Sequence, residues 1–110
     1  MNISQSEING FMVVSIEGEI DLNSSPQMRK AFTDLVERKV SKIVVDFSKV
    51  AYIDSSGLAT LIEMMQRLKK NQGHMYLVQM SAKIKSIFEI TRLDKLFSIF
   101  ANVDEVVKAG

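Results

Sequence analysis

Residues 43–68 read IVVDFSKVAYIDSSGLATLIEMMQRL and join a short apolar run to a segment with helical periodicity. In residues 43–47 only Asp46 interrupts the β-branched and aromatic residues, a pattern typical of a strand buried on both faces of a parallel sheet. From about residue 56 to residue 72 apolar side chains recur at helical spacing, as in an amphipathic helix. A buried strand followed directly by a helix is the repeating unit of α/β folds, so this stretch predicts that class.

The flanking segments extend the pattern. Asn9 and Gly10 separate two strand-like runs, residues 3–8 and 11–18, and Asn-Gly between such runs is the strongest short-range hairpin signal. A helix is expected to start near Pro26 and to end near residue 40. The later expected elements are a strand at 75–78, a helix around 84–93, a strand at 97–100 and a helix at 103–109. This order predicts a mixed, mostly parallel central sheet of about five strands with an N-terminal antiparallel hairpin and about four helices.

Composition limits the function classes. A length of 110 residues predicts one domain spanning 1–110. The net charge of +1 gives no electrostatic reason to expect binding to nucleic acid or to an anionic membrane. The chain has no cysteine and a single histidine, His74, which excludes disulfides, thiolate metal sites and multi-histidine metal sites. We expect no metal and no cofactor. The absent cysteines, the lack of a signal-peptide pattern and the lack of a long apolar stretch favour a soluble, cytoplasmic protein.

The tetrad Asp54-Ser55-Ser56-Gly57 lies between the predicted strand and helix. A helix N-terminus offers unpaired N–H groups and partial positive charge, so a hydroxyl there is well placed to carry a phosphate. Gly57, which has no side chain, would let a partner's backbone approach closely. Asp and Ser before a helix are also ordinary caps, and capping alone is the alternative interpretation. Two hydroxyls, a carboxylate and a glycine are more than a cap requires.

A second polar turn, Gly18-Glu19-Ile20-Asp21, stands where the second strand hands over to the first helix. If this strand and the one at 43–47 are neighbours in the sheet, Asp21 and Asp54 open onto the same sheet end, where functional groups gather in α/β folds. The structural alternative is that Gly18 ends the strand and Asp21 caps the helix.

These two motifs and the element order resemble the STAS domain family, and more narrowly its stand-alone bacterial anti-sigma factor antagonists. The resemblance covers essentially the whole chain. It implies a partner switch in which the unphosphorylated antagonist binds an anti-sigma factor that is also a serine kinase, and so frees the sigma factor. The kinase then phosphorylates the antagonist and releases it, and a metal-dependent serine phosphatase of the PP2C type restores it.

Carried over by position, the resemblance places the phosphate acceptor on Ser55. Asp21 and Asp54 match the acidic residues beside the acceptor, Ser56 matches the neighbouring serine, and Gly57 matches the glycine that opens the helix. The partner surface is expected to continue along the second helix through positions outside the core. These positions are Thr60, Glu63, Met64 and Arg67. We expect a monomer whose partners are the kinase and the phosphatase.

Two other interpretations stay open. The chain could be a STAS partner-switching regulator whose output is stress or secretion control rather than a sigma factor. It could also be a nucleotide-binding module, or an enzyme with Ser55 as nucleophile and Asp54 as base. The sequence has no Gly-x-Ser-x-Gly elbow and no Walker glycine-lysine loop, and His74 falls at the far end of the second helix from Ser55, which disfavours catalysis.

Overall fold

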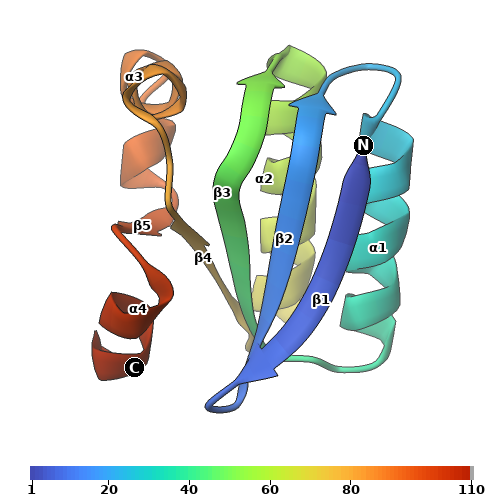
Figure 1. Ribbon diagram of the computed structural model, residues 1–110. Helices are drawn as coiled ribbons and strands as arrows, with labels where there is room; N and C mark the ends of the chain where they lie inside the picture. Colours follow the sequence, from blue (N-terminus) through green and yellow to red (C-terminus); the bar gives the residue numbers. More distant parts are fainter. Residues whose placement is uncertain (110) are drawn as a thin grey trace.

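The computed structural model describes residues 1–109 and contains one five-stranded sheet flanked by helices (Figure 1). The elements are β1 (Asn2–Ile8), β2 (Phe11–Ile20), α1 (Ser25–Glu37), β3 (Lys42–Ile53), α2 (Ser55–Lys70), β4 (His74–Val78), α3 (Ala82–Ile90), a 3₁₀ turn (Leu93–Lys95), β5 (Ser98–Phe100) and α4 (Val103–Ala109). The strands lie in the order β1-β2-β3-β4-β5, with β1 antiparallel to β2 and every other pair parallel. The predicted class, element order and sheet are confirmed. Within residues 1–109, no helix combines the length and the apolar character that crossing a membrane would require.

The N-terminal hairpin forms where Asn9-Gly10 predicts it. Asn9 and Gly10 have φ angles of 50° and 85°, the positive values that both central residues of a type I′ turn need. The turn fixes the register of β1 on β2, and side chains then alternate between the two faces of the sheet. Val14 belongs to the core on one face and Val13 to the core on the other.

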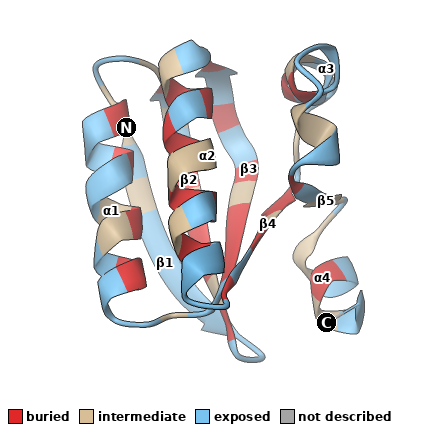
Figure 2. Cartoon of the chain, turned by 180° about the vertical axis from the view of Figure 1, so that it is seen from behind, coloured by how far each residue is buried: buried red, intermediate tan, exposed pale blue. Residues whose placement is uncertain are grey.

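The two faces of the sheet are covered unequally. Right-handed crossovers between successive neighbouring strands place their connecting helices on one face. The larger core accordingly contains residues of α1, α2 and α3, such as Phe32, Leu61 and Phe88, packed on that face. Figure 2 views the molecule from this side, with α1 and α2 in front of the sheet. The smaller core on the other face packs Val106 of α4 against strand residues that include Val44.

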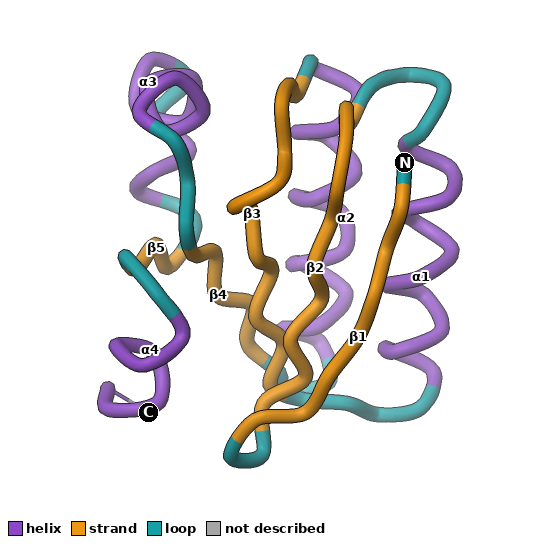
Figure 3. Tube along the Cα trace, viewed as in Figure 1, coloured by secondary structure: helices purple, strands orange, loops and turns teal. Residues whose placement is uncertain are grey.

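β3 is longer than the predicted strand at 43–47. Its first half pairs with both β2 and β4, but beyond Asp46 it pairs with β2 alone and runs on to Ile53. The pairing with β2 shifts register after Asp46, and β3 bends along its length (Figure 3). The exposed Ser48 and Lys49 interrupt the apolar pattern and so hide the continuation. The extension brings Ile53 level with Ile20, the last residue of β2.

α1 ends at Glu37 rather than near residue 40. Lys39 adopts a left-handed φ of 61°, and the N–H of Val40 donates to the carbonyl of Leu35 with an N···O distance of 3.0 Å. This six-residue closure is the Schellman arrangement that commonly ends helices. Lys39 continues the helical spacing of the preceding residues, so the sequence predicts too long a helix. In the structure the helix has already ended at Glu37.

Gly73 follows the end of α2, but it is not the left-handed residue that a glycine helix stop usually provides. α2 finishes at Lys70, and the left-handed residue is Gln72, with a φ of 63°. The N–H of Gly73 then donates to the carbonyl of Leu68 with an N···O distance of 2.8 Å. A Cβ on Gly73 would lie 2.9 Å from the carbonyl oxygen of Ser41, so this glycine is required by space.

The C-terminal third differs from the prediction only at element ends. α3 stops at Ile90, and Leu93 belongs to the 3₁₀ turn rather than to the helix predicted around 84–93. β5 begins at Ser98 rather than at residue 97. Phe97 is 5% exposed, with its ring edge-on to Phe88, so it contributes to the core and not to the strand.

Gly57 lies where α2 begins on the ends of β2 and β3. A Cβ at this position would lie 2.6 Å from Cγ2 of Ile20, 2.8 Å from Cγ1 of Ile53 and 2.9 Å from the carbonyl oxygen of Ile20. The last contact involves backbone, which cannot rotate away as a flexible side chain can. The absence of a side chain therefore lets the helix backbone rest directly on the two strand ends. The buried Gly57 faces these strands, so the prediction that it lets a partner's backbone approach is wrong.

We predict that Gly57→Ala lowers the free energy of unfolding by about 1–3 kcal/mol, the usual range for overpacking a well-packed site. Urea denaturation followed by circular dichroism measures the change. Ser55→Ala, at the exposed start of the same helix, is the matched control and should stay within about 0.5 kcal/mol of the wild type. Equal stability of Gly57→Ala and the control would contradict the close packing.

Candidate functional site

β2 and β3 end side by side. Ile20 and Ile53 are register partners, and the N–H of Asp54 donates to the carbonyl of Ile20 with an N···O distance of 3.1 Å. Asp21 and Asp54 follow these two strand ends directly, so they open onto the same end of the sheet, as the sequence predicts. In open α/β sheets this carboxyl end is where functional groups collect.

Asp54 caps α2. Its backbone is extended, and its carboxylate Oδ1 accepts a hydrogen bond from the N–H of Gly57 with an O···N distance of 3.1 Å. α2 consequently begins at Ser55, one residue before the predicted start. Ser55 is exposed, whereas Ser56 is partly buried. The first turn carries no acidic side chain, so the partial positive charge of the helix N-terminus is not offset within it.

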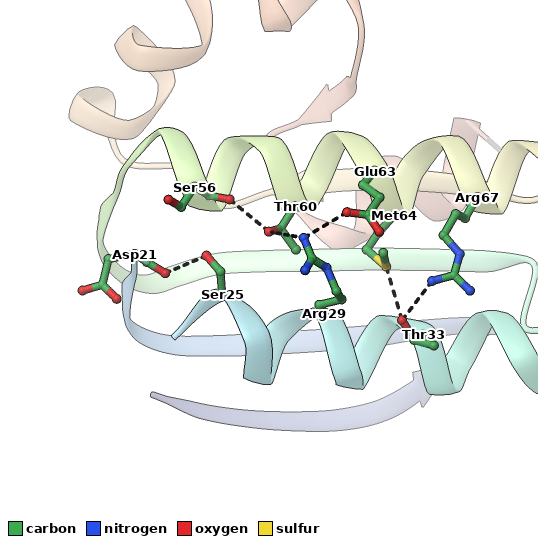
Figure 4. Close-up of polar contacts among 9 residues, drawn as sticks. All are labelled: Asp21, Ser25, Arg29, Thr33, Ser56, Thr60, Glu63, Met64 and Arg67. Atoms are coloured by element: carbon green, nitrogen blue, oxygen red, sulfur yellow. Dashed lines mark hydrogen bonds and ion pairs between the residues drawn. The ribbon is translucent and has the colours of Figure 1, made fainter. Parts of the chain in front are cut away.

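Asp21 holds the β2–α1 loop and does not cap α1. Its carboxylate Oδ1 accepts hydrogen bonds from the N–H groups of Asn23 and Ser24, each with an O···N distance of 3.0 Å. Ser24 occupies the N-cap position of α1 and makes no side-chain capping bond. The carbonyl of Asp21 accepts from the hydroxyl of Ser25 at 2.6 Å, a contact drawn in Figure 4. These bonds make the loop beside the tetrad a locally ordered turn.

Thr60 and Met64 are buried, so their prediction as positions outside the core is wrong. Their exposed fractions are 2% and 0%. The reason is α1, which packs against this face of α2: the sulfur of Met64 accepts from the hydroxyl of Thr33 at 3.8 Å (Figure 4). The hydroxyl of Thr60 donates to the carbonyl of Ser56 with an O···O distance of 3.0 Å.

Glu63 and Arg67 are partly exposed, as predicted, and both reach across to α1. Glu63 Oε1 lies 2.9 Å from Nη2 of Arg29, and Nη1 of Arg67 donates to the hydroxyl of Thr33 at 3.1 Å. The second Nη2 contact of Arg29 is with the hydroxyl of Thr60 at 3.5 Å. We call this row of residues between the two helices the α1–α2 seam. Its members are Arg29, Thr33, Thr60, Glu63 and Arg67.

Sequence reasoning misses the contribution of α1 and two exposed apolar residues. Arg29 and Thr33 are four residues apart and so share one face of α1, and successive crossovers set α1 beside α2. The spacing of Arg29 and Thr33, taken together with the expected placement of α1 beside α2, could have identified both residues as part of the site. Leu22 and Tyr52 are 71% and 41% exposed and stand at the same sheet end as Asp21 and Asp54. Nothing in their local pattern distinguishes them from core residues.

The described part of the chain, residues 1–109, contains no group of three or more His, Cys, Asp or Glu side chains that could hold a metal ion. His74 opens β4, beyond the C-terminal end of α2, and is remote in the fold from Ser55 at the start of that helix. The tetrad therefore presents an exposed hydroxyl, a capping carboxylate and a helix N-terminus whose first turn carries no acidic side chain.

The sequence matches the STAS domain family over residues 2–106. The chain belongs to this family. Among STAS relatives, the anti-sigma-B factor antagonist of Staphylococcus aureus is 28% identical over 99 residues, which are 90% of this chain and 92% of the relative.

Solved structures of STAS proteins share the fold. That of an anti-sigma factor antagonist from Mycobacterium paratuberculosis is 28% identical and has a TM-score of 0.88, covering 98% of this chain and 92% of its own. Unphosphorylated SpoIIAA, an anti-sigma factor antagonist, is 19% identical with a TM-score of 0.75, covering 98% and 96%. Phosphorylated SpoIIAA of Bacillus is 17% identical with a TM-score of 0.74, covering 99% and 100%. The STAS fold of this chain thus resembles both forms equally well.

We predict that Asp54→Ala lowers the free energy of unfolding by about 1 kcal/mol, because the N–H of Gly57 loses its acceptor. Asp54→Asn keeps an oxygen acceptor at the cap and should retain most of the stability. Urea denaturation of the two variants side by side provides the measurement. If both lost the same stability, the negative charge of Asp54, and not its capping bond, would be what stabilises the helix.

Proposed function

We propose that this STAS protein is an anti-sigma factor antagonist that works by partner switching. Unmodified, it binds an anti-sigma factor that is also a serine kinase, and so releases the sigma factor. The names of its relatives support the antagonist role. The observation that carries the switch is the exposed Ser55, first residue of α2, directly after the capping Asp54.

Ser55 is the proposed phosphate acceptor. A kinase must reach the hydroxyl, and Ser55 is exposed whereas Ser56 is partly buried. The N-terminus of α2 is a favourable place for an anion, since the helix dipole is positive there. We infer that a PP2C-type phosphatase removes the phosphate, and that the antagonist takes part as a cytoplasmic monomer.

Phosphorylation is proposed to block docking and to leave the fold intact. The phosphate adds about −1.5 to −2 charges and stands on the surface of the helix start, next to the carboxylate of Asp54. Asp21 adds a second carboxylate at the same sheet end. Burying the phosphate under a partner without a cation costs several kcal/mol, on the order of a hundredfold or more in affinity. The fold itself keeps the favourable interaction between the helix dipole and the anion.

Phosphosite mapping tests the acceptor. After incubation with ATP and the serine kinase encoded nearest to it, the wild type should carry a single phosphate on Ser55 by mass spectrometry. Ser55→Ala should carry none, and Ser56→Ala should be phosphorylated like the wild type. A phosphate that persists in Ser55→Ala, or that disappears in Ser56→Ala alone, would refute the assignment.

Binding tests the consequence. We predict that Ser55→Asp binds the same kinase at least about tenfold more weakly than the wild type in calorimetry, because a carboxylate carries only part of a phosphate's charge. Ser55→Ala should bind like the wild type. Ser86→Asp, which adds the same charge at an exposed position of α3, is the control and should also bind like the wild type. Undiminished binding by Ser55→Asp would count against a charge-based switch.

A further inference from the structure

A notch lies beside the tetrad, at the end of the α1–α2 seam nearest the carboxyl ends of β2 and β3. It is a hollow of about 280 Å³ whose walls include Leu22, Pro26, Arg29, Ser56, Ala59 and Thr60. Ser56 is thus a wall of the notch, and the exposed Ser55 precedes it directly in the chain. Any partner that covers Ser55 closely therefore meets the notch as well.

The rim of the notch is apolar and exposed. Leu22 is 71% exposed, and Pro26 and Ala59 are also on the surface. The base of the notch is well ordered, because Thr60 is only 2% exposed and its hydroxyl donates a hydrogen bond to the carbonyl of Ser56. An apolar rim on an ordered base is the kind of site in which a partner's side chain binds at little entropic cost.

The seam that leads away from the notch includes a guanidinium, that of Arg67, which makes no ion pair within residues 1–109. Arg29 stands in the notch wall and is paired with Glu63, and one turn further along α2 Arg67 contacts only the hydroxyl of Thr33. Within residues 1–109 the ion pairs are Arg29–Glu63 and Arg38–Asp34, so Arg67 has no carboxylate partner there. Among the five members of the seam, two carry a guanidinium and one a carboxylate, and Asp34 and Glu37 line the adjoining face of α1 with Arg29 and Thr33. Guanidinium has five donors in a planar fork that suits carboxylates, and both groups keep donors free.

We propose that the notch and seam bind an acidic segment of the kinase partner, which inserts one apolar side chain between Leu22 and Ala59 and sets carboxylates on Arg29 and Arg67. The inference rests on the proposed function and adds the chemistry of the partner's segment and the contribution of α1. It places the contact on both helices, sets Thr60 at the base of the notch and leaves out the buried Met64 as a direct contact. Charge steering along the seam would also make the binding sensitive to salt.

The dissociation constant of the unphosphorylated protein for the kinase tests the proposal. Ala59→Trp fills the notch from an exposed helix position, and Arg67→Glu reverses the charge of the unpaired guanidinium; each should weaken binding at least tenfold. Lys83→Glu makes the same charge change at an exposed position of α3 and is the matched control, expected within twofold of the wild type. Circular dichroism melts establish that the variants are folded.

Arg67→Gln removes the charge without setting a carboxylate one turn from Glu63, so it keeps the test valid if Arg67→Glu impairs folding. It should weaken binding at least threefold and flatten the salt dependence of the dissociation constant. Wild-type affinity in folded Ala59→Trp and Arg67→Gln would overturn this inference alone, whereas failure of the wild type to bind any serine kinase would overturn the proposed function. A wild-type dimer in ultracentrifugation that Ala59→Trp abolishes would assign the notch to a second copy and also overturn the inference.

Discussion

The backbone of α2 rests on the ends of β2 and β3 with no side chain between them at Gly57. A Cβ there would meet Ile20 and Ile53 at less than 3 Å, so the helix start can lie this low only with glycine. The N–H of Asp54 bonds to the carbonyl of Ile20 at the same place, which joins both strand ends to the helix. The close packing of the start of α2 on these strand ends leaves Ser55 exposed and sets Asp54 beside the loop of Asp21. The geometry of the whole candidate site follows from it.

A phosphate on Ser55, at the start of α2, can change the surface charge of the proposed switch without changing its fold. The helix N-terminus favours an anion, and the loop of Asp21 is held by its own hydrogen bonds. The fold resembles those of unphosphorylated and phosphorylated SpoIIAA, with TM-scores of 0.75 and 0.74. In the proposed switch, the energetic effect of a phosphate on Ser55 falls on docking, where the charge must be desolvated.

Local sequence patterns predict much of the fold and of the candidate site. The features that they miss depend on packing between segments that are distant in the sequence. The Asn9-Gly10 hairpin and the shared sheet end of Asp21 and Asp54 follow from turn geometry and from parallel topology. The burial of Thr60 and Met64 does not, because it depends on which face of α2 meets α1, and periodicity within one helix leaves the borders of that face undetermined. The missed length of β3 has a similar cause: beyond Asp46 the strand has only one neighbour, so its exposed residues look like a loop. The role of Arg29 appears only when both helices are in place.

The most direct measurement compares the unmodified protein with the same protein phosphorylated on Ser55, determining for each the free energy of unfolding and the dissociation constant for the kinase. We expect unfolding free energies within about 1 kcal/mol of each other, because a phosphate at a helix N-terminus is tolerated or favoured. The dissociation constant should rise at least about a hundredfold, which corresponds to roughly 2.7 kcal/mol. A phosphorylated protein that loses most of its stability, or that binds the kinase as tightly as before, would contradict a switch that acts at the docking surface.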